Sequence, residues 1–160
     1  MKQFCDNGGL IEKRKVNDLC ELKDYDIIIN CSGLGARSLV KDPLVYPIRG
    51  QVVAVKPQQP IKAIYERHDQ ASPYIIPHHD YVLLGGTAER DCWSEVPDPD
   101  ITRTVYDECI NVMPSLKGAE VVDSWAGLRP ARETVRLEVD MEMSRALETV
   151  SYIQVSSLVL

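Results

Sequence analysis

DIIINCSG, residues 26–33, is the stretch that decides the fold class. Three isoleucines follow one another there, and the apolar run stops at Ser32-Gly33. A short apolar run with this ending is typical of a strand buried on both faces, as in parallel sheets. The small residues from Ser32 to Ala36 allow the backbone to approach a phosphate or ribose. A tight strand-to-helix turn without a ligand is the alternative.

Further strands and helices are predicted on either side of this stretch. The clearest helix spans Ile101 to Met113, because apolar residues recur there at helical spacing, with Asp100 as N-cap and Pro114 as its end. A short helix is predicted at 36–40 and a helical segment at 142–148. Residues 10–16 are compatible with a strand. Strands are predicted at 51–56, 63–65, 74–76, 81–84, 119–125 and 134–139, and residues 150–160 are compatible with a tail strand inserted in a sheet. This order predicts a mixed α/β (α+β) fold.

Charge and composition exclude several classes of protein. Of the 160 residues, 44% are hydrophobic and 26% are charged, which is ordinary for a folded domain. The net charge of −6 argues against nucleic acid or an anionic membrane as the main partner. No segment approaches the ~20 apolar residues of a membrane span, and the first residues do not form a signal peptide.

A metal site is not expected. The five cysteines are odd in number and show no CxxC spacing, which argues against a disulfide framework or a zinc site. His78-His79-Asp80 offers possible ligands, but neighbouring residues on a strand point in opposite directions, and no third ligand has matching spacing. No serine stands in a nucleophile-elbow context.

The most informative stretch for function is WAGLRPARETVR, residues 125–136. Pro130 restricts Arg129 to an extended conformation, and an arginine on stiff backbone suits bidentate capture of a carboxylate. If the segment is a strand, Arg132 and Arg136 share one face and Arg129 lies on the other. The alternative is that all three arginines form surface ion pairs with nearby glutamates. Tyr74, next to a rigid Ser72-Pro73 turn, offers one phenolic hydrogen bond, although a tyrosine with no such role is the commoner outcome.

Several short motifs occur in an order that resembles the D-amino-acid oxidase and D-aspartate oxidase family. These motifs lie at 14–16, 29–33, 49–51, 72–77, 84–86 and 127–137. The resemblance implies an FAD-binding domain and a β-rich substrate domain with a mixed sheet. Residues 1–48 then form part of the FAD domain, 49–128 most of the substrate domain, and 129–160 the return to the FAD domain with an atypical tail.

The resemblance also implies roles for individual residues. Arg129 and Tyr74 match the residues that hold the substrate carboxylate. Arg67 lies seven residues before Tyr74, a spacing similar to that of an arginine that binds the side-chain carboxylate in D-aspartate oxidases. The positions that match cofactor contacts are Val16, Ser32, Gly33 and Arg136. No residue is expected to act as a catalytic acid or base.

The implied reaction is FAD-dependent oxidative deamination of a D-amino acid by oxygen to a 2-oxo acid, ammonia and hydrogen peroxide, with acidic D-amino acids favoured. The family's N-terminal GxGxxG is absent from the sequence, and residues 141–160 do not resemble the usual C-terminus. An internal fragment is therefore expected. A non-catalytic remnant and a relative of glycine or sarcosine oxidases are the alternatives. The family implies a peroxisomal location, although Leu158-Val159-Leu160 is not a Ser-Lys-Leu signal.

Overall fold

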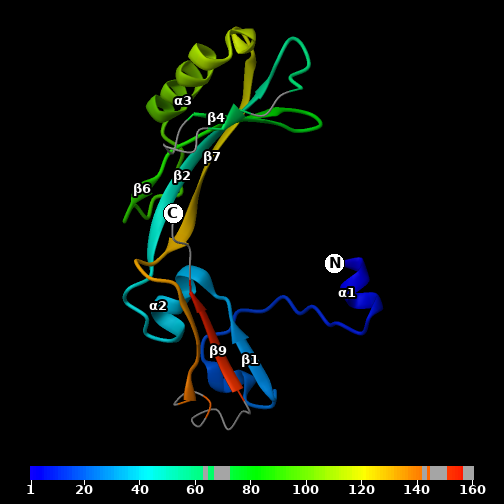
Figure 1. Cartoon of the computed structure of the whole chain (residues 1–160), viewed down its shortest axis with the longest axis vertical. Helices are drawn as coiled ribbons and strands as arrows, with labels where there is room; N and C mark the ends of the chain where they lie inside the picture. The colour runs from blue at the N-terminus through cyan, green and yellow to red at the C-terminus, as the bar shows by residue number, and fades with distance from the viewer. Residues whose placement is uncertain (63–64, 67–72, 142–143, 145–150, 157–160) are drawn as a thin grey trace.

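The chain forms two β-sheets in a computed structural model, which describes residues 1–62, 65–66, 73–141, 144 and 151–156. The larger sheet is organised around β2 (Tyr46–Lys56) (Figure 1). On one side, β2 pairs along its length with β7 (Glu120–Ala131); on the other it pairs with β5 (Val82–Gly85) and β6 (Glu89–Arg90). The sheet continues from β5 through β4 (Tyr74–Pro77) to β3 (Tyr65–Glu66). All these pairs are antiparallel.

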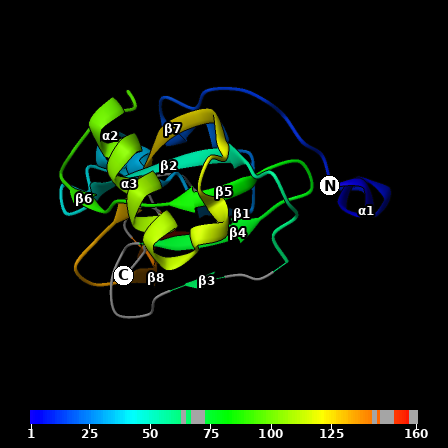
Figure 2. The same cartoon turned by 90° about the horizontal axis from the view of Figure 1, so that it is seen from above.

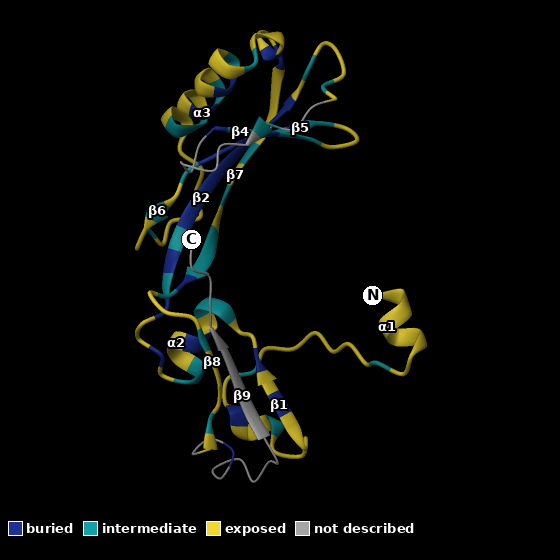
Figure 3. Cartoon of the chain, viewed as in Figure 1, coloured by how far each residue is buried: buried dark blue, intermediate teal, exposed yellow. Residues whose placement is uncertain are grey.

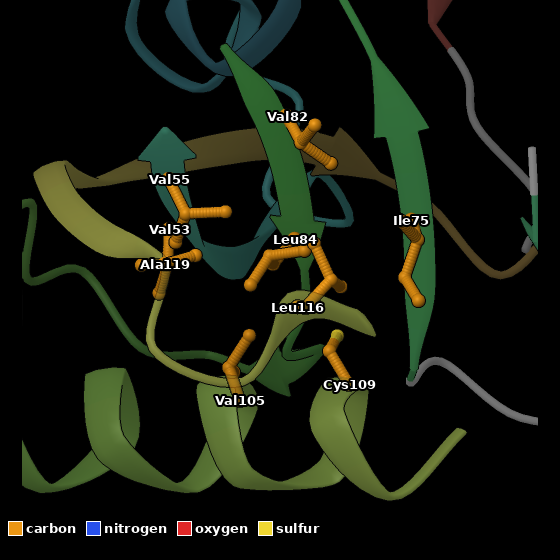
Figure 4. Packing of buried hydrophobic residues seen from close by; sticks show 9 residues of the cluster. All are labelled: Val53, Val55, Ile75, Val82, Leu84, Val105, Cys109, Leu116 and Ala119. Atoms are coloured by element: carbon orange, nitrogen blue, oxygen red, sulfur yellow. The ribbon is translucent and has the colours of Figure 1, made fainter. Parts of the chain in front are cut away.

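One face of the larger sheet is covered by helix α3 (Pro99–Val112) and a following 3-10 turn, η3 (Pro114–Leu116) (Figure 2). The helix begins at Asp98, whose side chain accepts hydrogen bonds from Asp100 N and Ile101 N. The predicted cap, Asp100, is thus two residues too late, because Pro99 occupies the first helical turn, where its fixed φ is favourable. Figure 4 shows the core between helix and sheet, formed by Val53, Val55, Ile75, Val82, Leu84, Val105, Cys109, Leu116 and Ala119.

The pleat of β2 divides its side chains between two environments. Val53 and Val55 belong to the core under α3. Because side chains alternate along a strand, Gly50 and Val52 point to the opposite face of the sheet from Val53. Figure 3 shows β2 buried over nearly all its length. The sheet thus has a filled face and a second face that no described helix covers.

The smaller sheet contains β1 (Ile27–Asn30), β9 (Ser151–Ser156) and β8 (Arg136–Val139), in the order β1-β9-β8. β1 and β9 are parallel, whereas β8 and β9 are antiparallel. The smaller sheet is therefore the mixed one, whereas the described strand pairs of the larger sheet are all antiparallel, so the mixed sheet expected for the substrate domain does not form there. For β4 and β5 the reason is local, because residues 78–81 are too few for the crossover that a parallel pair needs. The mixed α/β class is confirmed.

The prediction of a strand buried on both faces at 26–31 is wrong for this structure. Ile28 is 6% exposed and packs with Leu19, beside η1 (Leu19–Leu22) and α2 (Ala36–Leu39). Ile27 and Ile29 are 57% and 60% exposed, because the pleat turns them to the face that no described residue covers.

The remaining predictions have mixed outcomes. No strand forms at 10–16, and the N-terminal helix α1 (Lys2–Asp6) stands apart from the rest of the chain (Figure 1). The tail strand forms as β9, whereas nearly all of the helix predicted at 142–148 lies outside the described residues. The predicted domain boundaries after Ile48 and Leu128 fall inside β2 and β7, and the domain division stays a prediction.

Candidate functional site

Arg129 and Tyr74, the two residues predicted to bind a carboxylate, lie on the face of the larger sheet that no described helix covers. We call it the open face. Ile48 lies opposite Arg129 on β7, and Val52 lies opposite Gly85, which itself lies opposite Tyr74. Directly opposite residues of antiparallel strands project to the same face. Arg129 and Tyr74 therefore lie on one face, and this face is turned away from α3.

Arg129 lies flat against the sheet over Gly50. A methyl group placed on Gly50 would lie only 2.0 Å from Arg129 Nη1, so the guanidinium occupies the space left by the missing side chain. Nη1 donates one long hydrogen bond, 3.4 Å, to the carbonyl oxygen of Thr87. Among the described residues, no carboxylate lies within 4 Å of this guanidinium. Most of its N–H groups are thus available to a ligand.

Tyr74 has the same relation to a second glycine. A methyl group on Gly85 would lie 1.8 Å from Tyr74 Cζ, so the ring covers this residue. The phenolic oxygen reaches to 3.1 Å from the position that a Cβ on Gly86 would take. The hydroxyl of Tyr74 and the guanidinium of Arg129 therefore approach two consecutive residues, Gly86 and Thr87.

A hollow of about 230 Å³ lies between β2 and β7 on this face. Its lining consists of small and apolar residues around one cation, namely Gly50, Val52, Trp125, Gly127, Leu128 and Arg129. The volume corresponds to several water molecules at about 30 Å³ each, which is room for a small molecule. A cation in an otherwise apolar hollow suits a small organic anion.

A larger hollow, about 330 Å³, lies at the far end of the same sheet, between residues 56–61 and 77–82. At about 3.3 Å per residue, Lys56 lies roughly 26 Å along β2 from Ile48, the partner of Arg129. Its charged side chains, such as Lys56 and Asp80, are exposed. We assign no chemistry to this hollow, because it lacks a buried charged group.

The turn after β1 lies beside the arginine motif. Gly33 has φ +58°, a conformation that favours glycine, and a Cβ there would lie 3.3 Å from Pro130 Cγ. Close packing against Pro130 thus explains this glycine without a ligand. The hydroxyl of neighbouring Ser32 is exposed and has no hydrogen-bond partner among the described residues. Val16 is half-buried in a segment without helix or strand.

Arg136 is held in an ion-pair cluster. Its Nη1 lies 3.2 Å from Oδ2 of Asp42, a carboxylate that is 2% exposed and lies 3.4 Å from Arg132 Nε. Burial alone would lower the pKa of Arg136, but hydrogen bonds to Glu138 and Asp42 raise it above its ordinary value. The alternative that the three arginines form ion pairs therefore holds for Arg132 and Arg136. It does not hold for Arg129, which has no carboxylate partner among the described residues. The expected cofactor contact of Arg136 stays a prediction.

Two other predictions concern Arg67 and a possible metal site. Arg67 lies outside the described residues. His79 Nδ1 lies 2.7 Å from Asp80 Oδ1 at an exposed position, and no group of three or more possible metal ligands gathers in the part of the chain that the structure describes. Within the same residues, no helix has both the length and the apolar character to cross a bilayer.

Some residues at the site were missed by sequence reasoning. Gly50, Gly85 and Thr87 determine where the two polar side chains lie, yet the first two were noted only as parts of motifs and Thr87 was not noted. The sequence predicts both glycines just outside strands, at 51–56 and 81–84, whereas they lie inside β2 and β5, where a glycine marks close approach by other groups.

The fold also occurs in solved structures of other proteins. In solved structures, the fold is similar to glycine oxidase from Geobacillus kaustophilus, with TM-score 0.68, 21% identity and coverage of 80% of this chain and 35% of that chain. Iminodiacetate oxidase from Chelativorans sp. BNC1 also gives a TM-score of 0.68, with 17% identity and coverage of 84% and 37%. At these identities the likeness concerns the fold alone.

Sequence comparison then defines the family. Residues 2–143 match the family DAO, described as FAD dependent oxidoreductase, and the chain belongs to this family. It is 44% identical over 133 residues to a D-amino-acid oxidase of Streptomyces coelicolor and 38% identical over 141 residues to a D-aspartate oxidase of Homo sapiens. These alignments cover 82% and 88% of this chain and 41% of each relative. The chain thus spans about two fifths of the length of these relatives.

The family is FAD-dependent, and the described residues fit part of such a cofactor's surroundings. The Ser32 hydroxyl is exposed, has no hydrogen-bond partner in the part of the chain that the structure describes, and lies on the turn that packs against Pro130, next to Arg129. A flavin edge could be held there by Ser32 and the adjoining backbone. The sequence has no GxGxxG for the pyrophosphate, so these residues would hold only one portion of FAD.

Proposed function

We propose that this chain forms the substrate-carboxylate site of an FAD-dependent oxidase of D-amino acids. The observation that carries the proposal is the half-buried Arg129 guanidinium, which lies over Gly50 without a carboxylate partner among the described residues and on the same face as Tyr74. Oxygen takes the two electrons to become hydrogen peroxide, and water hydrolyses the imino acid that is formed, so the products are a 2-oxo acid, ammonia and hydrogen peroxide.

Arg129 and Tyr74 act by orientation. The guanidinium binds the two carboxylate oxygens in a bidentate manner, and each charged hydrogen bond contributes about 1.5–3 kcal/mol. The Tyr74 hydroxyl adds a further hydrogen bond from a rigid aromatic ring. When bound, FAD supplies the chemistry, accepting the hydride of the substrate Cα and passing the electrons to oxygen. The chain itself fixes the direction of Cα, and Trp125 and Val52 line the hollow in which the substrate would lie.

We further propose that acidic D-amino acids such as D-aspartate are favoured. The proposal rests on the spacing of Arg67 and Tyr74 and on the similarity to a human D-aspartate oxidase. A second cation near Arg129 would pair with the side-chain carboxylate of a dicarboxylic substrate. The higher identity to a D-amino-acid oxidase supports a neutral substrate instead, so the substrate panel must include both kinds.

The direct test uses the 160-residue chain labelled with ¹⁵N-arginine. Titration with D-aspartate is expected to shift the Nε–H signal of Arg129, and Arg129→Lys removes both signal and binding, because lysine keeps the charge but loses the planar pair of donors. Arg103→Lys is the matched control, since Arg103 is exposed on α3 and lies 3.7 Å from Asp100 as its charged partner. Unchanged D-aspartate affinity in Arg129→Lys contradicts the proposed role.

Turnover is tested in a chimera in which residues 2–143 replace the matching segment of the Streptomyces coelicolor relative. Peroxide release is measured with D-aspartate, D-glutamate, D-alanine and D-proline, and Arg67→Leu is expected to reduce only the first two. If Arg67→Leu changes all four equally, the acidic preference is wrong. If the chimera binds flavin but releases no peroxide with any of the four, a non-catalytic remnant is favoured.

Glycine and sarcosine serve as two further substrates, because a relative of glycine or sarcosine oxidases would favour them. We also propose a peroxisomal location for the protein in cells, on the basis of the family resemblance. Fluorescence microscopy of an N-terminally tagged protein, together with a peroxisomal marker, tests this location.

A further inference from the structure

A chain of hydrogen bonds runs from the buried interior of the larger sheet to Arg129, and Thr87 is its last member. The Thr87 hydroxyl accepts a hydrogen bond from Gln51 N at 3.0 Å and donates one to Glu89 Oε1 at 2.9 Å. The Thr87 backbone N–H donates to Gln51 O at 3.3 Å. Three hydrogen bonds thus fix a residue that follows β5 and belongs to no strand.

The partners of Thr87 are themselves held firmly. Glu89 Oε1 accepts from Arg49 Nη1 at 2.5 Å, and Arg49 is only 2% exposed. Arg49 Nη2 donates to Gln51 Oε1 at 2.6 Å, and Gln51 is fully buried. Arg49 and Gln51 form the buried end of this network, where breaking a hydrogen bond leaves a desolvated polar group, whereas Glu89 and Thr87 form its partly exposed end.

The free end of this network contacts the candidate site. The Thr87 carbonyl oxygen is the acceptor for Arg129 Nη1, and it is the polar partner that the structure gives this guanidinium. Gly50 beneath the guanidinium limits its height above the sheet, while the carbonyl limits its rotation. Contact with Gly50 and the hydrogen bond to Thr87 together restrain the guanidinium.

We propose that Thr87 is a positioning residue that orients Arg129 for carboxylate binding. This inference rests on the proposed function of Arg129 as the carboxylate-binding residue. The Thr87 hydroxyl holds its own peptide against Gln51 and Glu89, and the carbonyl of that peptide then sets the direction of the guanidinium. Thr87 does not touch the carboxylate itself.

The inference predicts different results for two substitutions. Thr87→Val keeps the shape of the side chain but removes both hydroxyl hydrogen bonds, whereas Thr87→Ser keeps both. In Thr87→Val the peptide is less restrained, the long bond to Arg129 is lost, and D-aspartate binding is expected to weaken about threefold to tenfold, the effect of one hydrogen bond. Thr87→Ser is expected to bind within twofold of the original chain.

The experiment has one measurement without any ligand and one with D-aspartate. In the ligand-free chain, the heteronuclear NOE of the Arg129 Nε–H group reports its fast motion, and it is expected to fall in Thr87→Val and to recover in Thr87→Ser. Thr104→Val is the matched control, because Thr104 is exposed on α3 and donates a comparable side-chain hydrogen bond, to Asp100 O at 2.9 Å. Thermal unfolding of all three variants separates a general loss of stability from a local effect.

The outcomes distinguish this inference from the proposed function. An unchanged Arg129 NOE in a folded Thr87→Val chain overturns the positioning role, whatever happens with the ligand. A lowered NOE that Thr87→Ser restores supports the role, even if the original chain fails to bind D-aspartate, a failure that would count only against the proposed function. A change of equal size in Thr104→Val would also overturn the inference, because the effect would then not be local.

Discussion

Replacing Gly50 by alanine separates the fold from the function of the open face. The new Cβ would lie 2.0 Å from Nη1 and 2.5 Å from Cζ of Arg129, whereas real Cβ contacts shorter than 3.0 Å essentially never occur. The guanidinium must therefore retreat by at least 3.0 − 2.0 = 1.0 Å. The far end of a long side chain can make this movement at little cost to the fold.

The expected magnitudes differ sharply for stability and binding. Gly50 does not have a positive φ, so alanine fits the backbone and offsets some lost packing by restricting the unfolded chain, a stabilising effect of about 0.4–1 kcal/mol. The free energy of unfolding should thus stay within about 1 kcal/mol of the original. A guanidinium displaced by 1 Å loses at least one charged hydrogen bond, about 1.5–3 kcal/mol, which corresponds to roughly tenfold to 150-fold weaker D-aspartate binding.

The assay combines urea unfolding with titration of D-aspartate, followed by NMR. Gly35→Ala is the matched control, since Gly35 lies outside the hollow, has φ −61° and would place its Cβ in ordinary contact, 3.4 Å from Ser32 Cβ. The reasoning is refuted if Gly50→Ala binds within threefold of the original chain, or if Gly35→Ala loses as much affinity as Gly50→Ala.

Three further predictions follow from the same structure. Gly85→Ala should weaken D-aspartate binding about tenfold in titration, because the new methyl group would overlap the Tyr74 ring at 1.8 Å. Asp42→Asn should lower the free energy of unfolding in urea by about 3 kcal/mol, because two partly buried arginines lose their shared carboxylate. Burial raises the pKa of Cys109 from 9.0 to about 11, so the folded state keeps this proton longer than the unfolded state. Stability should therefore fall as pH rises from about 9 to 11, and a Cys109→Ala chain should lose less stability over the same range.

Local sequence patterns predicted the strands and the helix around the core but not their full extent. β7 was expected to end at Trp125, yet it continues to Ala131. Pro130 lies opposite Pro47 on β7, which among the described strands pairs with β2 alone, so a missing N–H is tolerated on its other edge. The length of β7 is therefore determined by its pairing with β2. Because β2 lies some 80 residues away in the sequence, the residues around Pro130 alone do not predict this pairing.

In the candidate site, too, some features follow from neighbouring residues and others depend on strand pairing. The stiffness of Arg129 before Pro130 follows from neighbouring residues, and the sequence was sufficient to predict it. The convergence of Arg129 with Tyr74 depends on the registers of β2 with β7 and of β4 with β5. A one-residue slip in either register would turn a side chain to the α3 face, so neither Gly50 nor Gly85 could be assigned as a contact before the pairing was known.

The parallel pairing of β1 with β9 sets an order of events during synthesis. Ile27 pairs with Ser151, so the two strands are separated by more than a hundred residues of chain. The strands of the larger sheet, from Tyr46 to Ala131, leave the ribosome before β9 exists and can collapse first. Until β9 is synthesised, the backbone N–H and C=O groups on the edge of β1 that β9 will pair with remain unpaired and can bind chaperones or other nascent chains.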